Sequence, residues 1–452
     1  MERLLFARIE VWIVLLIGVI WLVATVLFGA LVVESFDEKP NFGSAPRLAR
    51  LIAEVPLNTE RLLSEDTAIQ VWNSAAFDGM QTGWTFPKGQ AAAASEGYLL
   101  LSRYNGTLKR HVIELVDLRD WQVRYTWTPD ASDLLGGVTC SSRFADCGSW
   151  DRAHFRAIHP LALANGDIIM KDHYSPVFRI DACARRQWVS DRVLYHHSTE
   201  PDGDTGFWVD SLVDPQSIDR VDPDFVEDEI VHMDVDGKIL FRQSVATLVL
   251  REGWGPLIFA TGTYYKDPTH LNDIEPVLKD GHYWKKGDVF LSLRNLSTVM
   301  IYRPSEDRVI WSKTGPWESQ HDVDILDDHR ISVYDNHAQD RGGNPYFAST
   351  SDVVVYDFAD GSTQSLLPGV FQREAIKTAA AGLSTVLPDG KVLIEDVSNA
   401  RMLMFTAEGE TVATYANRAQ NGRVFHLGWS RWLDQDLGDR IVASVKDVRC
   451  ES

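Results

Sequence analysis

The feature that most constrains the fold of this chain is a pattern that recurs from about residue 95 to the C-terminus. Each copy has a turn containing Asp or Asn with Gly, a short apolar strand, a few polar residues, and a second strand that often ends near Trp or Tyr. Three copies read LANGDIIMKDHYSPVFRID, KGDVFLSLRNLSTVMIYRP and LPDGKVLIEDVSNARMLMF. Asp-Gly and Asn-Gly turns suit hairpins because both residues tolerate positive φ. The pattern therefore predicts an all-β fold built of hairpins.

The spacing of the copies indicates how these hairpins are arranged. Successive copies are about forty to seventy residues apart, around the length of a four-stranded propeller blade with its loops. A β-sandwich also uses hairpins, but repetition of whole hairpin pairs favours a closed ring, which hides the edges of its sheets. Seven partial copies are visible, and a first and a last fragment often combine into one blade. The sequence therefore predicts a six-bladed β-propeller, with seven blades as the alternative.

The N-terminus carries a second strong signal. Residues 11–33 contain no charge and are long enough to cross a bilayer as a helix. Arg3 and Arg8 precede this stretch and acidic residues follow it, which favours a cytoplasmic N-terminus. A cleaved signal peptide is the alternative, although the apolar stretch is long for one and no convincing cleavage site follows. We expect a single-pass membrane protein whose propeller is periplasmic or extracellular.

These signals divide the chain into three parts. Residues 1–36 are predicted to be a cytoplasmic tip and transmembrane anchor, residues 37–90 a linker with a short helical or irregular segment, and residues 91–452 the propeller. The formal net charge of −20 argues against binding of nucleic acid by the body of the protein. It leaves room for an anionic small molecule held by a few local Arg and His side chains.

The four cysteines fit an oxidising compartment. Cys140 and Cys147 enclose a short loop with no nearby His, so a local disulfide is the natural interpretation. Cys183 and Cys450 are also able to pair, which would tie the C-terminus to an early repeat, and the sequence leaves this pairing open.

Three histidines lie at matching places in the repeats. His197, His270 and His321 each come shortly before a first strand, in YHHSTEPDGDTGFWV, THLNDIEPV and SQHDVDILDD. Equivalent positions of successive blades lie around the central axis of a propeller, so these side chains are expected to face one funnel. Acidic neighbours offer metal ligands, but no compact two-His motif supports zinc. We therefore expect no metal cofactor, with structural calcium as the alternative.

An ordered set of motifs resembles the arylsulfotransferase (ASST) family over about residues 95–435. The motifs are HHSTEPDGDTGFWV, HLNDIEPV, WSKTGPWESQHDVDILDDHRISVYDN, RGGNPYF, LPDGKVLIEDVSNARMLMF and LGWSRW. The resemblance implies a six-bladed propeller that moves a sulfuryl group from a phenolic sulfate to a phenol. It also implies a sulfated histidine intermediate and no nucleotide donor.

The resemblance assigns roles to individual residues. His270 and His321 match funnel histidines of the family, and Arg341 matches an arginine that would hold the sulfate, so these three are the predicted catalytic residues. The predicted substrate-binding residues are His197, Asn272, Asn336, Trp317 and Tyr346.

One position departs from the family pattern. The nucleophilic histidine is expected just ahead of the strand that begins LPDG, but the segment there reads IKTAAAGLSTVLPDG and has no imidazole. Two hypotheses follow. Either another histidine (His321, His270 or His426) attacks the sulfate, or the protein is a non-catalytic propeller that binds a ligand or serves as an accessory subunit of a membrane complex.

Overall fold

The protein is described here from a computed structural model. The described residues are 10–35, 41–63, 81–87, 94–139, 142–145, 147–203, 205–259, 265–341, 344–420 and 422–450. The chain forms two compact units, Met1–Thr67 and Ala68–Ser452.

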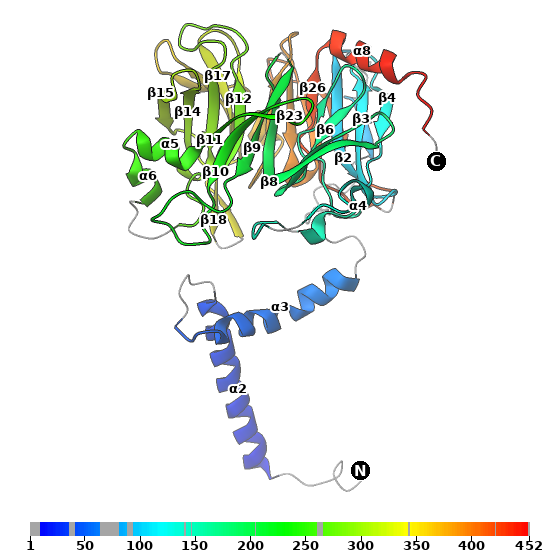
Figure 1. Ribbon diagram of the computed structural model, residues 1–452. Helices are drawn as coiled ribbons and strands as arrows, with labels where there is room; N and C mark the ends of the chain where they lie inside the picture. Colours follow the sequence, from blue (N-terminus) through cyan, green and yellow to red (C-terminus); the bar gives the residue numbers. More distant parts are fainter. Residues whose placement is uncertain are drawn as a thin grey trace. The chain divides into compact units, whose positions relative to one another are not determined.

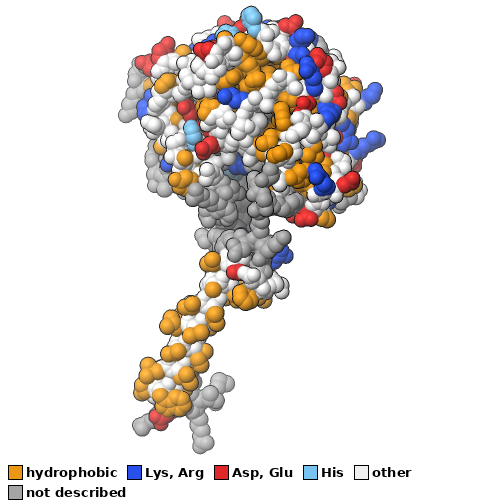
Figure 2. All heavy atoms as spheres, turned by 90° about the vertical axis from the view of Figure 1, so that its left-hand side faces the viewer, with side chains coloured by type: hydrophobic (Ala, Val, Ile, Leu, Met, Phe, Trp, Pro, Cys, Tyr) orange, Lys and Arg blue, Asp and Glu red, His pale blue; other side chains and the backbone are white. Residues whose placement is uncertain are grey.

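The first unit contains two helices, α2 (Val11–Glu34) and α3 (Ala45–Leu63). Helix α2 is long and apolar enough to cross a membrane, and Figure 2 shows mostly hydrophobic side chains on the face of it in view. Its 24 residues span about 36 Å at the rise of an α-helix. The predicted apolar helix is therefore present. A signal sequence near an N-terminus has the same properties, so retention of the helix in the membrane stays a prediction.

Helix α3 falls in the segment for which a short helix was predicted. Its apolar side chains Leu48, Leu51, Ile52 and Val55 follow helical spacing, which places them along one side of the helix. All four are more than half exposed within the structure.

The second unit consists mainly of antiparallel sheets (Figure 1). Four of them have four or five strands each. The first contains β26 (Arg431–Leu433), β2 (Tyr98–Asn105), β3 (Arg110–Asp117) and β4 (Gln122–Trp127). The second contains β12 (Leu271–Pro276), β13 (Val289–Leu293), β14 (Thr298–Arg303) and β15 (Arg308–Thr314). The third contains β16 (His321–Ile325), β17 (Arg330–Asp335), β20 (Asp352–Asp357) and β21 (Thr363–Ser365). The fourth contains β22 (Leu383–Val386), β23 (Val392–Asp396), β24 (Arg401–Phe405), β25 (Thr411–Ala416) and β1 (Gly83–Thr85).

The fifth large sheet has seven strands. They are β5 (Leu161–Ala162), β6 (Ile168–Met170), β7 (Ser175–Ile180), β8 (Arg186–Pro201), β9 (Gly206–Leu212), β10 (Asp228–Asp234) and β11 (Ile239–Ser244). Strands β18 (Ala338–Arg341) and β19 (Asn344–Phe347) form a separate hairpin. The short helices are α4 (Ala131–Leu134), α5 (Val245–Arg251), α6 (Gly255–Phe259), α7 (Val370–Arg373), α8 (Gln435–Val445) and the 3-10 turns η2 (Cys147–Ser149), η3 (Arg294–Leu296) and η4 (Val397–Asn399).

This arrangement confirms the predicted all-β, propeller-like fold in its coarse form. The ends of the second unit join sheets formed by other parts of the chain: β26 pairs with β2, and β1 pairs with β25. Such pairing removes exposed sheet edges, as closure of a ring requires. Strand β1 lies within residues 37–90, a segment predicted to be a linker with a helical or irregular portion.

Adjacent sheets are also joined through their edge strands. The Ser198 hydroxyl accepts a hydrogen bond from the Ile274 amide at 3.1 Å, and Asp273 accepts one from the Val323 amide at 2.8 Å. Asp322 in turn accepts one from the Ser384 amide at 2.7 Å. Ser198, Asp273 and Asp322 lie on β8, β12 and β16. The same kind of hydrogen bond, from an amide of one sheet to a side chain of its neighbour, therefore joins successive pairs of sheets.

A disulfide joins Cys183 to Cys450 across 267 residues, with the two Cα atoms 5.3 Å apart. The pairing that the sequence left open is thus present, and it ties the turn between β7 and β8 to the C-terminus. Cys147 is also disulfide-bonded, and its predicted partner Cys140 lies outside the described residues.

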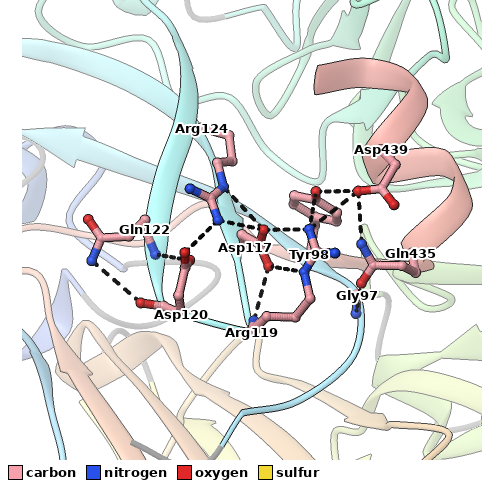
Figure 3. Close-up of polar contacts among 9 residues, drawn as sticks. All are labelled: Gly97, Tyr98, Asp117, Arg119, Asp120, Gln122, Arg124, Gln435 and Asp439. Atoms are coloured by element: carbon pink, nitrogen blue, oxygen red, sulfur yellow. Dashed lines mark hydrogen bonds and ion pairs between the residues drawn. The ribbon is translucent and has the colours of Figure 1, made fainter. Parts of the chain in front are cut away.

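Helix α8 is held against the first sheet by a polar network (Figure 3). The Tyr98 hydroxyl donates to the Asp439 carboxylate at 2.6 Å, and the Gly97 amide donates to the Gln435 side chain at 3.1 Å. Arg119 donates both to the Tyr98 hydroxyl and to the buried Asp117 carboxylate. Hydrogen bonds from arginines hold the pKa of Asp117 well below its usual value, so the carboxylate at the centre of the network stays charged.

Gly438 of α8 lies so close to Tyr98 that a larger residue there is expected to destabilise the protein. A Cβ atom added at Gly438 would lie 1.9 Å from Cδ2 of Tyr98, whose ring is buried and whose hydroxyl is bonded to Asp439. Gly438→Ala is expected to lower the free energy of unfolding by about 1–3 kcal/mol, because neither the ring nor the helix can move without breaking this network. Thermal melting of the full-length protein in detergent measures the loss. Gly255→Ala is the matched control, since a Cβ there meets only Leu250, at 3.4 Å. Equal melting temperatures for the two variants would contradict the prediction.

Candidate functional site

The candidate site is a cavity of about 410 Å³ lined by imidazole and guanidinium groups. Five histidines and two arginines contribute to its wall. They are His173, His197, His270, His321, His426, Arg156 and Arg294. The sequence predicted that His197, His270 and His321 face one funnel, and the structure brings them together. The rings of His270 and His321 lie 5.0 and 6.4 Å from the ring of His197.

Local backbone irregularities aim these three side chains. Pairing registers shift by a bulge in each strand concerned: between His196 and Thr199 in the last part of β8, and at Asn272 and Asp322 near the starts of β12 and β16. His197 and His270 also have positive φ values of 40° and 46°, which are uncommon for residues other than glycine. Bulges re-aim side chains that a regular strand would point elsewhere, so the histidines reach the cavity because the strands are irregular there.

His270 is oriented by a carboxylate three residues before it. Its Nδ1 lies 2.6 Å from Oδ2 of Asp267, so Nδ1 carries the proton and donates it. In the neutral ring the Nε2 lone pair is then available for a ligand, and no described residue forms a hydrogen bond with it. The side chain of His270 is 21% exposed. His270 therefore presents an oriented, accessible nucleophilic nitrogen.

His321 is bonded through both of its ring nitrogens. Nδ1 lies 2.7 Å from Oδ1 of Asn336, and Nε2 accepts a hydrogen bond from the Ala381 amide at 2.9 Å. The Asn336 amide group is itself fixed, since it donates to the carbonyl oxygens of Thr378 and Ala381. Because both nitrogens are engaged, His321 would have to break a bond before it could attack a ligand.

Burial keeps four imidazoles of the site neutral, those of His173, His197, His321 and His426. It lowers the pKa of His173, His197 and His321 well below the usual value, and neighbouring histidines and arginines lower it further. Burial, followed by the charge of Arg156, lowers the pKa of His426 to about 4. At neutral pH these rings are uncharged, so the fixed positive charge of the cavity comes from its arginines.

Four other predicted residues do not line the cavity. Asn272 is buried and donates from its amide to the carbonyl oxygen of Gln320 at 2.8 Å. Trp317 is 1% exposed and packs in a hydrophobic cluster with Val323 and other apolar residues. Asn336 contacts His321 instead of the cavity.

Tyr346 is the fourth predicted residue that does not line the cavity. It lies on β19, where it is 48% exposed. Arg341 is the last residue of β18, and its side chain lies outside the described part of the chain, so its predicted catalytic role stays a prediction.

Asp267, His173 and the two arginines of the cavity were not predicted from the sequence. Asp267 stands three residues before His270, and this His–carboxylate spacing was visible in the sequence. Arg294 opens the turn η3, which follows the second strand of its sheet, and η4 occupies the same place in another sheet. Alignment of LRNLSTVMIY with DVSNARMLMF would have marked this turn as equivalent in both repeats. Arg156 precedes β5 outside any repeated motif and offered no such signal.

Carboxylates lie on β8, β12 and β16, close in sequence to the histidines. Asp273 and Asp322 are buried, and Glu200, Glu275 and Asp324 are half-buried. Burial, followed by repulsion from Glu200, raises the pKa of Asp273 to about 7. Arg431 contributes positive charge here, with its guanidinium 2.7 Å from the Glu200 carboxylate.

The fold and the cavity together define a propeller-like β-protein with a histidine- and arginine-lined ligand site. Residues 159–418, more than half of the chain, match the arylsulfotransferase (ASST) family model. The chain therefore belongs to the arylsulfotransferase family. No curated protein that was compared with the chain matches it.

Several solved structures are similar to this chain. One is a protein of unknown function from Bacteroides caccae, with 12% identity, a TM-score of 0.45, and coverage of 75% of this chain and 99% of that one. Another is the Dos1 propeller, with 8% identity, a TM-score of 0.38, and coverage of 75% of each chain. A third is the Cps50 (Swd1) β-propeller domain of Myceliophteria thermophila, with 8% identity, a TM-score of 0.40, and coverage of 76% of this chain and 99% of that one.

The raised pKa of Asp273 predicts a pH effect on stability. A carboxyl group whose pKa is about 7 when folded, compared with 3.8 as the ordinary value, stabilises the folded state at low pH and loses this contribution as pH rises to about 7. Asp273→Asn removes the ionisation and keeps an oxygen that can accept from the Val323 amide. Its melting temperature is expected to fall less steeply than that of the wild type between pH 4 and pH 7.

Histidines with lowered pKa act in the opposite direction in both proteins, so the difference between the two melting curves isolates Asp273. Asp436→Asn, at an exposed position of α8, is the control and should follow the wild type. Parallel curves for Asp273→Asn and the wild type would contradict the assignment.

Proposed function

We propose that this protein transfers a sulfuryl group from a phenolic sulfate to a phenolic acceptor, with His270 as the nucleophile. Family membership supports the reaction class. The observation that carries the assignment of the nucleophile is the hydrogen bond between His270 Nδ1 and Asp267, which leaves Nε2 available in a cavity that two arginines line.

The proposed reaction has two displacement steps. In the first, the Nε2 lone pair of His270 forms a bond to sulfur while the bond from sulfur to the phenolic oxygen breaks, and the phenolate leaves with that electron pair. Asp267 stabilises the positive charge that develops on the ring, because Nδ1–H already donates to it. In the second step, the oxygen of the acceptor phenol attacks sulfur and the nitrogen–sulfur bond breaks. The electron pair of the broken bond returns to Nε2, so His270 regains its neutral form. The proton that the acceptor loses passes, through solvent, to the phenolate released in the first step.

Other residues of the cavity would divide the remaining tasks. Arg156 and Arg294 carry the fixed positive charge that attracts a sulfate ester, since guanidinium groups bind such oxyanions through several donors. His173 and His197 are neutral and are suited to donate hydrogen bonds to the oxygens of the transition state. His321 would position the cavity wall, and Arg341 would hold the sulfate as the family resemblance implies.

We infer that the second unit has six blades. Strand β8 has 16 residues; its first part pairs with β7, and its last part pairs with β9. If β8 serves two blades, the seven-stranded sheet supplies four strands to each. Together with the four smaller sheets this makes six, with β1 as an additional strand on one of them.

His270→Gln is expected to reduce turnover of a chromogenic aryl sulfate by at least about 10³-fold, because it removes the nucleophile. Asp267→Asn is expected to reduce turnover by about 10²-fold, because the ring loses its orienting carboxylate. His154→Gln is the matched control. His154 Nδ1 also contacts an aspartate three residues before it, Asp151, at 2.7 Å, but this pair is exposed outside the cavity. Steady-state kinetics of the full-length protein measures all three variants.

Intact-mass analysis after incubation with the aryl sulfate tests the covalent step. An adduct with the mass of SO₃ that maps to His270 would support the proposal. An adduct on His321 or His426 would overturn the choice of nucleophile. Absence of both adduct and released phenol from the folded protein would overturn the transfer reaction.

A non-catalytic role is the second candidate, and one observation favours it. Ala379, Ala380 and Ala381 line the cavity just ahead of β22, where the family resemblance leads one to expect the nucleophilic histidine. In this case the protein would bind a phenolic ligand, or act as an accessory subunit of a membrane complex, without transferring sulfate.

Helix α2 would anchor either form in the membrane, with the second unit on the extracytoplasmic side. Deletion of residues 1–36 is expected to move the protein from the membrane fraction to the soluble fraction, because α2 is the membrane-spanning candidate among the described residues. Copurification of a membrane partner that this deletion abolishes would support the accessory role. A deletion variant that stays in the membrane fraction would contradict the anchor.

A further inference from the structure

Behind the wall of the cavity, three side chains of types that commonly ligate metals converge in a buried pocket. They are His196 and His197 on β8 and Asp210 on β9, with exposed fractions of 1%, 7% and 0%. The two Nδ1 atoms are 2.7 Å apart, and Oδ2 of Asp210 is 3.9 Å from Nδ1 of His196. The three donor atoms all lie within 4.8 Å of one another.

The backbone of β8 departs from regular geometry to make this arrangement. Successive side chains of a regular strand point to opposite faces of the sheet, so neighbouring residues such as His196 and His197 should not meet. The bulge between His196 and Thr199, with a φ of 40° at His197, turns both imidazoles to the same place. A positive φ at a residue other than glycine stores strain that proteins concentrate at functional sites.

The two Nδ1 atoms form a hydrogen bond with each other, which a bound ion would replace. The other hydrogen bonds of the three residues leave ligand atoms available. Nε2 of His196 is 3.3 Å from the carbonyl oxygen of Ser211, and a proton on Nε2 leaves Nδ1 with a lone pair. A backbone carbonyl bonded to the opposite ring nitrogen is the usual support for a metal-binding histidine. Asp210 accepts from the Ser198 hydroxyl through Oδ1 at 3.0 Å, and Oδ2 has no hydrogen-bond partner although it is buried. Such an oxygen is costly unless something pairs with it.

The charges around Asp210 favour a cation at this place. Asp228 and Asp273 are close enough to repel its charge, and Lys171 is the cation that interacts with it. The Lys171 ammonium is directed to the carbonyl oxygen of His197.

We propose that His196, His197 and Asp210 bind one divalent transition-metal ion of the zinc class. Two imidazole nitrogens and one carboxylate oxygen form a donor set that such ions prefer. The two measured separations, 2.7 and 3.9 Å, bracket the ~3.4 Å between ligand atoms of a tetrahedral site with bonds of about 2.1 Å. The ion would enter from the cavity, which His197 lines, and would place positive charge beside the site that binds the anion. No metal was expected from the sequence, because adjacent histidines do not form a compact motif such as H-E-x-x-H.

Metal analysis of the full-length protein tests the proposal. The protein is purified in detergent without a polyhistidine tag, treated with a chelator, and titrated with Co²⁺ as a coloured substitute for Zn²⁺. One Co²⁺ per chain is expected, with visible absorption that added Zn²⁺ abolishes. His196→Gln and Asp210→Asn are expected to weaken binding by more than the ~10–100-fold that changes around a metal site usually cost, because each removes a ligand.

His329→Gln is the control for the remaining metal-ligand cluster of the described residues. Asp327, Asp328 and His329 form that cluster at the surface, and the variant should bind Co²⁺ at the buried site like the wild type. Melting temperatures with and without Zn²⁺ guard against misfolding of the variants. Zn²⁺ should raise the melting temperature of the wild type and of His329→Gln, but not that of folded His196→Gln or Asp210→Asn.

Three results would overturn the proposal. One is wild-type protein that binds no Co²⁺ and gains no stability from Zn²⁺. Another is unchanged binding in both His196→Gln and Asp210→Asn. The third is loss of binding only in His329→Gln, which would place the ion in the surface cluster. None of these outcomes bears on sulfuryl transfer, because the readouts are metal content and stability.

Discussion

The structure depends on hydrogen bonds that backbone amides of one sheet donate to buried carboxylates of the neighbouring sheet. Asp273 bonds the Val323 amide, Asp322 bonds the Ser384 amide, and Glu395 bonds the amides of Trp429 and Ser430. Each bond satisfies an amide at or just before the start of an edge strand. Since His270 directly precedes β12 and His321 begins β16, the bonds that join these sheets also hold two of the histidines of the cavity in place.

Irregular residues in and beside the strands show how a β-fold can build a cavity for a ligand. Bulges and positive φ angles at His197 and His270 cost conformational energy, of the order of 1–3 kcal/mol for each strained residue. The rigid neighbouring sheets hold these conformations in place. A regular strand would point alternate side chains into the packed space between sheets. The histidines reach the cavity, and not the core between the sheets, because their backbone is irregular.

Sequence patterns predicted the parts of this structure that follow from repetition. The hairpin repeat predicted the sheets, and the matched positions of His197, His270 and His321 predicted their meeting. The remainder depended on contacts between distant residues. Trp317 was expected beside a ligand, but the apolar residues of neighbouring strands form a cluster around it. Asn336 was expected to bind substrate, but its amide bonds His321, 15 residues earlier, and carbonyls more than 40 residues later.

The electrostatics of the cavity separate the binding of an anion from the attack on it. The protein carries a formal charge of −20, so an anionic substrate must be drawn in by local charge. Burial keeps His173, His197 and His321 neutral, and that charge therefore comes from Arg156 and Arg294. A protonated imidazole would attract the sulfate but could not attack it, because its lone pair would be occupied. Fixed guanidinium charges beside uncharged imidazoles meet both requirements at one pH, and an ion bound at His196, His197 and Asp210 would increase the attraction without protonating the nucleophile.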